Sequence, residues 1–312
     1  MQNKTIVIGG AGAIGKNLVS FLLEKEHEVL VIDNLSSGSW NNLSPKSSFI
    51  HCDISDKSKI EDLIISYNPN YIYNLAAHFA NQNSVDYPYE DIKTNILGQV
   101  NVLEACKKVK NLKKYIYASS SCVYGHLETM NEECGIYPYE TPYAINKFTA
   151  ELYTKYYAEQ FSIPTVSVRI FNTFGEGELA GKYRNVIPNF IDLALKGEDI
   201  KITGDGSETR DFTYALDTVN CLVLAGEAKF NQGEVFNSGT GIDTKIIDLA
   251  NMVISLTNSS SNVVFVGKRS WDGVKNRKSD VSKSEKLLGY KPNFTVEQGL
   301  LKTISWYQCQ TS

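Results

Sequence analysis

The sequence lacks the patterns that mark metal-binding, disulfide-rich and nucleic-acid-binding proteins. Its six cysteines contain no Cys-x-x-Cys pair, and its four histidines have no zinc-site spacing. We therefore expect reduced thiols and no metal. A net charge of -4 provides no basic field for a nucleic-acid backbone, so phosphate recognition should be local and the partner small.

Long apolar runs are also absent. No run approaches the roughly 20 residues that cross a bilayer, which predicts no membrane segment. A strand-like segment begins at Thr5 and leaves no room for a signal peptide, so we expect a cytoplasmic protein. There is no internal repeat or low-complexity linker. The 312 residues, 42% of them hydrophobic, suit two modest domains or one large domain with an appended lobe.

The N-terminal segment does contain a recognisable pattern of strand, glycine turn and helix. After the apolar residues 5–8, glycine recurs at every third position. Missing side chains let the backbone turn tightly and approach a pyrophosphate, whose charge then rests on the amides of the following helix. The predicted cofactor-binding residues of this turn are Gly9, Gly12, Ala13, Ile14 and Gly15.

Two further predicted strands end in aspartate. Asp33 has the spacing of a ribose-binding carboxylate and would repel a 2′-phosphate, and residues 29–45 contain no lysine or arginine, which favours NAD over NADP. Asp53 either accepts from the adenine amino group or caps the helix predicted over 56–66. The neighbouring Asn34 and Ile54 are included in the predicted cofactor site.

The segment ETPYAINKF places Tyr143 and Lys147 on one helix face, where Thr141 can cap and Pro142 suits the first turn. A tyrosine that titrates near ~10 needs a depression of roughly three units to act as a base at neutral pH, and a nearby ammonium favours this. A serine-tipped strand, YIYASSS, lies upstream. Tyr89 and Lys93 have the same spacing without such a strand, so we interpret them as a chance pair.

Strands near 5–8, 29–33, 49–51, 71–74, 114–118 and 165–171 alternate with helices, including the stretch 90–109. This alternation predicts an α/β fold with a doubly wound parallel sheet, whose ligands lie at the carboxyl ends of the strands. Residues 1–171 and about 213–238 should form this Rossmann domain. Residues 172–212 and 239–312 should form a smaller mixed α/β domain, with a helix over 185–196 that Gly197 ends.

Read in order, nine segments resemble the extended short-chain dehydrogenase/reductase family, in its nucleotide-sugar epimerase and dehydratase branch. They are GGAGAIG, DNLSSG, YNLAAH, TNILG, ASSSCVYG, PYAINK, RIFNTFG, GDGSETRDF and LGYKP, and they span nearly the whole chain. The resemblance implies NAD as the cofactor and a nucleoside-diphosphate sugar as the substrate. It adds Leu75, Ala76 and Ala77 to the cofactor site.

The resemblance also implies catalytic roles. Ser120 hydrogen-bonds the reacting sugar oxygen, and Tyr143 takes the hydroxyl proton while hydride passes to the nicotinamide. Lys147 lowers the pKa of Tyr143 and holds the nicotinamide ribose. Asn95 supports this arrangement through water, with an exposed helical asparagine as the alternative.

For the substrate, the resemblance assigns the diphosphate to Asn172, a phosphate to Arg210, and the nucleotide to Arg269 with Asp272. Each arginine has a surface ion pair as its alternative role. Arg169, inside a predicted strand, should instead have a buried structural partner.

The residues after Ser120 bear on the reaction. Dehydratases of the branch carry an Asp-Glu pair there, whereas this chain has Ser121 and Cys122, which also weakens a uronate decarboxylase assignment. We interpret Cys122 as a packing residue. A 4-epimerase is favoured, and a 4-dehydrogenase that releases the 4-keto sugar, with a heptose as one possible sugar, stays open.

A non-catalytic NAD-binding protein is a hypothesis of another class, because dinucleotide folds also serve that way. Such a protein need not keep Ser120, Tyr143 and Lys147 together. By analogy with the fold, we also expect a homodimer formed through the helices that contain Glu90 and Tyr143.

Overall fold

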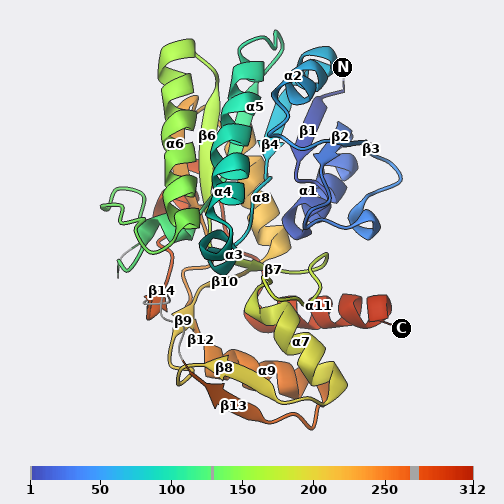
Figure 1. Ribbon diagram of the computed structural model, residues 1–312, viewed down its shortest axis with the longest axis vertical. Coiled ribbons are helices and arrows are strands. Elements are labelled where there is room, and N and C mark those ends of the chain that lie inside the picture. Colours follow the sequence, from blue (N-terminus) through green and yellow to red (C-terminus); the bar gives the residue numbers. More distant parts are fainter. Residues whose placement is uncertain (1, 128–129, 268–273, 312) are drawn as a thin grey trace.

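The computed structural model describes residues 2–127, 130–267 and 274–311. Its centre is a seven-stranded sheet with the order β11-β6-β5-β4-β1-β2-β3, in which every pair is parallel. The predicted doubly wound α/β fold is therefore confirmed (Figure 1). The strands are β1 (Lys4–Ile8), β2 (Glu28–Asp33), β3 (Ser48–His51), β4 (Tyr71–Asn74), β5 (Lys114–Ser120), β6 (Thr165–Ile170) and β11 (Gln232–Ser238).

Helices cover both faces of this sheet because alternate strand residues are buried on opposite sides. In β1, Ile6 and Ile8 pack with α2 (Lys57–Tyr67), α5 (Gln99–Cys106) and α6 (Pro142–Phe161). Val7 points the other way, into the layer formed by α1 (Ala13–Glu24) and α8 (Ala215–Glu227). The result is a three-layer domain with a buried sheet.

The strand order reverses beside β1, which has β2 on one side and β4 on the other. In open α/β sheets, such a switch point leaves a crevice outside the carboxyl ends of the strands, where ligands bind. Next to this crevice, the start of α6 is set by neighbouring residues in the sequence. Thr141 caps α6 by accepting from the amide of Ala144, and Pro142 occupies its first turn, as predicted.

The helix predicted over 90–109 consists of three consecutive segments. They are α4 (Pro88–Ile92), a π-helical segment (Lys93–Gly98) and α5, preceded by α3 (Asn81–Asp86). Wider π turns often occur at functional sites. This one contains Asn95, whose side chain accepts a hydrogen bond from the amide of His78, in the segment that follows β4.

A smaller lobe lies below the carboxyl edge of the sheet (Figure 1). Its core joins α7 (Val186–Lys196), α9 (Ile246–Thr257), α11 (Val296–Thr311), β8 (Ile200–Thr203) and β13 (Val263–Val266). Short strands connect the two parts: β7 (Asn172–Phe174) with β10 (Phe212–Tyr214), and β9 (Thr209–Arg210) with β12 (Thr244–Lys245) and β14 (Asn276–Arg277). The chain crosses between them repeatedly, since β11 returns to the large sheet and α10 (Ser282–Leu288) packs beside it.

Within the described ranges, we find no helix with both the length and the apolar character needed to cross a bilayer.

Candidate active site

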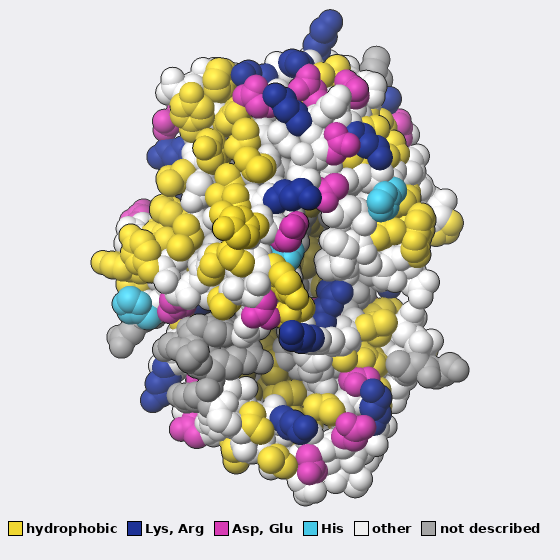
Figure 2. Space-filling view, viewed as in Figure 1, with side chains coloured by type: hydrophobic (Ala, Val, Ile, Leu, Met, Phe, Trp, Pro, Cys, Tyr) yellow, Lys and Arg dark blue, Asp and Glu magenta, His cyan; other side chains and the backbone are white. Residues whose placement is uncertain are grey.

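One cavity lies at the carboxyl edge of the sheet, and a narrow hollow is visible in the middle of the face drawn in Figure 2. Most of the residues singled out in the sequence line this cavity. They are Gly9, Gly12, Ala13, Ile14, Gly15, Asp33, Asn34, Asp53, Ile54, Leu75, Ala76, Ala77, Ser120, Tyr143, Lys147 and Asn172. Residues distant in the sequence are thus brought to one place.

The glycine turn leaves no room for side chains. Gly9 has a φ of +78°, and a Cβ on it would lie 2.8 Å from the amide nitrogen of Ala76. A Cβ on Gly15 would lie 2.3 Å from the carbonyl oxygen of Gly9. The helix α1 follows directly, with Gly12 at its cap position and no side-chain cap. Its first amides therefore remain available to an anionic group, and the residues present fit a dinucleotide.

Asp33 is nearly buried at the end of β2. Its carboxylate accepts hydrogen bonds from the amides of Ala11 at 3.0 Å and Leu35 at 2.7 Å. Burial raises the pKa of Asp33, and these amide hydrogen bonds oppose the rise. Because a carboxylate has about four acceptor positions, these amides leave room for a ribose hydroxyl.

Asp53 does not cap the helix that follows it. The cap of α2 is Asp56, which accepts from the amide of Lys59. Asp53 instead accepts from the amide of Ser55 at 2.8 Å and from the side chain of Asn34 at 2.9 Å, and it lines the cavity. Of the two interpretations considered for Asp53, the cap is wrong.

The three serines after β5 have different surroundings. Ser119 donates to Glu151, a buried residue of α6, and so has a structural partner. The Ser120 hydroxyl accepts from the amide of Cys122 at 3.2 Å and forms a hydrogen bond that favours the ionised form of Tyr143. Ser120 therefore faces the phenol.

Tyr143 and Lys147 are both buried beside this serine, at 5% and 2% exposure. The Lys147 ammonium donates to the carbonyl oxygen of Ala118 at 2.7 Å and lies 5.7 Å from the Tyr143 ring centroid. Burial lowers the pKa of Lys147 to about 8, while Asp91 and Glu151 raise it.

The pKa of Tyr143 does not follow the sequence-based expectation. Burial raises it, Cys122 and Asp91 add to the rise, and the hydrogen bond from Ser120 opposes it. The direction is therefore opposite to the predicted lowering by Lys147. The physical reason is desolvation, which penalises a phenolate more than an ammonium several ångströms away stabilises it.

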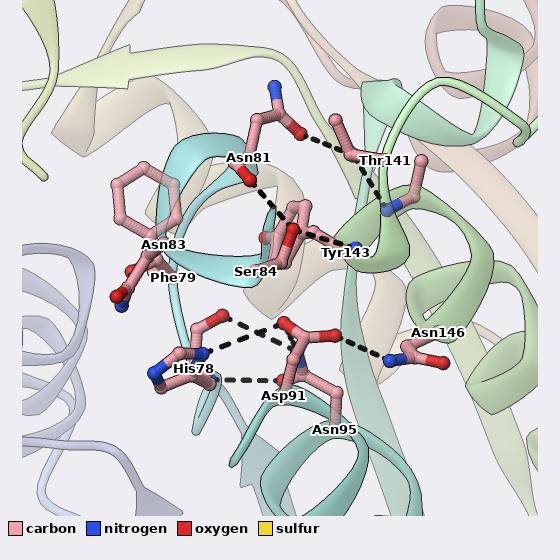
Figure 3. A network of polar contacts seen from close by, with 11 residues as sticks. His78, Phe79, Asn81, Asn83, Ser84, Asp91, Asn95, Thr141, Tyr143 and Asn146 are labelled. Atoms are coloured by element: carbon pink, nitrogen blue, oxygen red, sulfur yellow. Dashed lines mark hydrogen bonds and ion pairs between the residues drawn. The ribbon is translucent and has the colours of Figure 1, made fainter. Parts of the chain in front are cut away.

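Asn95 is not the exposed helical residue considered as an alternative. It is 2% exposed and does not line the cavity. Its side-chain oxygen accepts from the amide of His78, and its amide donates to the carboxylate of Asp91 (Figure 3). Asn95 thus connects the segment after β4 to helix α4.

The predicted substrate residues are placed differently from one another. Asn172 lines the cavity, and within the described part of the chain its buried Oδ1 atom has no hydrogen-bond partner. Arg210 donates to the carbonyl oxygens of Thr209 and Lys275 and is not among the residues that line the cavity. Arg269 and Asp272 lie outside the described residues.

Two cavity-lining arginines were missed by the sequence analysis. Arg277 of β14 is 6% exposed, and its guanidinium donates to the Cys122 sulfur at 3.3 Å, with Glu140 at 3.8 Å. Its Nε atom has no hydrogen-bond partner among the described residues. Arg184 donates to the carbonyl oxygen of Ser37 at 2.6 Å. No local motif marked either residue, because only the lobe's fold brings them to the cavity.

Arg169 has the buried partner that was expected. It lies 2.8 Å from Glu151, with both side chains 4% exposed, so this prediction is confirmed.

A nucleotide-binding turn, a switch-point cavity and a serine, tyrosine and lysine within it define an oxidoreductase-type site that works with a bound dinucleotide. The profile of the NAD dependent epimerase/dehydratase family matches residues 5–239. The chain belongs to this family of NAD-dependent enzymes.

Relatives of the chain share nearly its whole length. It is 34% identical to a UDP-N-acetyl-alpha-D-glucosaminuronate decarboxylase of Bacillus cytotoxicus, covering 99% of this chain and 98% of that protein. It is 30% identical to a UDP-glucose 4-epimerase of Mycolicibacterium smegmatis, with 98% of each covered. The crystal structure of the UDP-glucose 4-epimerase of Thermotoga maritima with UDP-glucose superposes with a TM-score of 0.95 at 32% identity, covering 99% of this chain and 100% of that one.

Proposed function

We propose that this protein is an NAD-dependent nucleotide-sugar 4-epimerase. The observation that carries the proposal is the composition of the cavity beside Ser120, Tyr143 and Lys147. A base and a hydroxyl donor for alcohol oxidation are present, whereas the positions after Ser120 hold Ser121 and Cys122 rather than an acid-base pair for elimination.

In the proposed reaction, Tyr143 takes the proton of the sugar C4 hydroxyl, and Ser120 hydrogen-bonds the same oxygen. NAD supplies the hydride acceptor and, in its oxidised form, a positive charge that favours the phenolate. The unpartnered Oδ1 of Asn172 and the donors of Arg277 are available to hold the substrate while the sugar turns.

Arg277 favours a second candidate, in which the sugar carries an acidic substituent. Its guanidinium is nine-tenths buried and lines the cavity, and its Nε atom has no partner in the ranges that the structure describes. Glu140 lies at 3.8 Å on one side of the guanidinium, and the remaining donors of this planar fork suit a second carboxylate, that of the sugar. A hexuronate is therefore included among the substrates, with epimerisation or decarboxylation after oxidation at C4.

Incubation of the NAD-loaded enzyme with UDP-hexoses, UDP-hexuronates and a nucleotide-activated heptose, followed by NMR, tests the proposal. We expect a C4 stereoisomer to accumulate without net formation of NADH. A stable 4-keto product with stoichiometric NADH would contradict the epimerase and favour the 4-dehydrogenase. Release of carbon dioxide from a hexuronate would favour decarboxylation.

We also propose that the enzyme is a homodimer. Apolar side chains gather over α6 and the π-helical segment that precedes α5 (Figure 2), where Leu97, Ile145, Leu152, Tyr156 and Phe161 are each at least 43% exposed. A continuous apolar face of this kind is typical of a protein interface. Light scattering should give the mass of a dimer, and Leu152→Glu should convert it to a monomer.

Leu301→Glu is the matched control for the dimer, because Leu301 has a similar exposure on α11, in the other lobe. This variant should remain dimeric. A wild-type mass equal to the monomer at high protein concentration would contradict the proposal.

A further inference from the structure

Asp91 of α4 is a fully buried carboxylate without a lysine or arginine partner in the described part of the chain. One oxygen accepts from Asn95 at 2.8 Å and the other from Asn146 at 2.5 Å. The His78 ring lies on the side of the carboxylate opposite to Asn146, with its Nδ1 atom 3.7 Å from a carboxylate oxygen (Figure 3). Because both oxygens accept from amides, this environment suits the ionised carboxylate.

Lys147 is likewise a buried charged group that has no oppositely charged partner close to it in the described part of the chain. Its ammonium donates to a neutral carbonyl, that of Ala118, and no carboxylate among the described residues lies within 4.0 Å of it. Two aromatic rings flank it, with centroids at 4.8 Å for Tyr117 and 5.7 Å for Tyr143. A buried ammonium in these surroundings tends to lose its proton.

Asn146 links Asp91 to α6. Its side-chain amide donates to the Asp91 carboxylate, and it directly precedes Lys147 on that helix. The charges also influence each other electrostatically. Asp91 is the largest influence that raises the pKa of Lys147, ahead of Glu151. Burial raises the pKa of Asp91, and the Asn146 amide, the His78 imidazole and Lys147 oppose this rise.

The other charged groups near Lys147 do not replace Asp91. Glu151 is hydrogen-bonded by the Arg169 guanidinium through two nitrogens, so its charge is neutralised locally. Cys122 influences the pKa of Lys147 less than Asp91 and Glu151 do, and burial raises the pKa values of the Tyr117 and Tyr143 phenols. His78 adds positive charge only when it is protonated.

We propose that Asp91 is a positioning residue whose buried negative charge keeps Lys147 protonated in the active site. Asp91 does not line the cavity, so it acts on the reaction only through Lys147. The inference rests on the proposed function for its catalytic consequence. An uncharged Lys147 no longer favours the phenolate of Tyr143, so turnover should fall as Lys147 loses its proton.

The test is the titration of Lys147 in the NAD-loaded enzyme, followed by NMR of 13Cε-labelled lysine and assigned with Lys147→Arg. In Asp91→Asn we expect the Lys147 titration to move about one pH unit lower, since the charge that raises its pKa is removed. The high-pH limb of kcat/KM should move by the same amount. At pH values well below that limb, activity should stay close to that of the wild type.

Glu90→Gln is the matched control, because it removes the same charge from the adjacent, exposed position of α4. It should leave the titration of Lys147 unchanged. Asp91→Ser serves as a second uncharged variant that can still accept from the amides, should Asp91→Asn fold poorly. An unchanged Lys147 titration in a folded, uncharged variant overturns the proposal, as does a loss of activity that is equal at every pH.

The NMR titration needs no substrate, so the two proposals can fail separately. A shifted Lys147 titration in an enzyme that converts no sugar nucleotide supports the role of Asp91 and counts against the proposed function alone.

Discussion

Tyr143→Phe is expected to lower kcat/KM by roughly 10²–10⁴-fold, the contribution of a general base, while NAD remains bound. The phenol is buried beside Ser120 in the cavity, and phenylalanine keeps the ring's packing while it removes the proton acceptor. The ring of Phe79, which meets Tyr143 edge to face at 6.1 Å between centroids, should keep its contact. Steady-state kinetics measure kcat/KM, and the NAD released when the purified variant is denatured measures the bound cofactor.

The second Tyr-x-x-x-Lys pair provides the control. Tyr89 is 85% exposed and lies four residues before Lys93, so Tyr89→Phe makes the same chemical change at the same spacing outside the cavity. Its kcat/KM should match that of the wild type. Wild-type turnover in Tyr143→Phe would show that another group takes the proton.

Arg169→Ala is expected to lower the free energy of unfolding by about 3–5 kcal/mol, the usual cost of removing one partner of a buried ion pair. Glu151 is 4% exposed and would remain as an uncompensated charge, with Ser119 as its remaining hydrogen-bond donor. The guanidinium also lies 4.7 Å from the ring centroid of Tyr124, and this contact would be lost. Urea denaturation followed by circular dichroism gives the change.

The control for this prediction is an exposed ion pair on α6, the helix that contains Glu151. Lys155 and Glu159 are 3.8 Å apart at 59% and 53% exposure, so Lys155→Ala should change the free energy of unfolding by less than about 1 kcal/mol. If Arg169→Ala and Lys155→Ala had equal effects, the buried pair would not have the structural role assigned to it.

The fold and much of the site could be predicted because they depend on short-range spacing. Glycines at every third position, Asp33 at a strand end, and Tyr143 one helical turn before Lys147 place their groups wherever the elements themselves form. The periodicity of strands and helices located the six N-terminal strands of the sheet within a few residues. Local geometry was therefore enough to predict these features from the sequence.

Other parts of the site could not be predicted in this way. The assignment of Arg210 to a phosphate stays a prediction, while Arg277 reaches the cavity from β14 although no motif marked it. The contact of Arg277 with Cys122 likewise depends on how the lobe folds back onto the end of β5. A residue's type does not specify which cavity its side chain enters.

The sequence by itself determined the order of the elements, the glycine turn and the Tyr143 and Lys147 pair that is proposed to react, because each depends on local patterns of residues. Only the tertiary structure decided the surroundings that shift their pKa values. It buries Tyr143, which raises the pKa of the phenol, and it brings Asp91 from a distant helix to Asn146, the residue that precedes Lys147. The reason is that desolvation and charge pairing depend on everything packed around a group, whatever its distance along the chain.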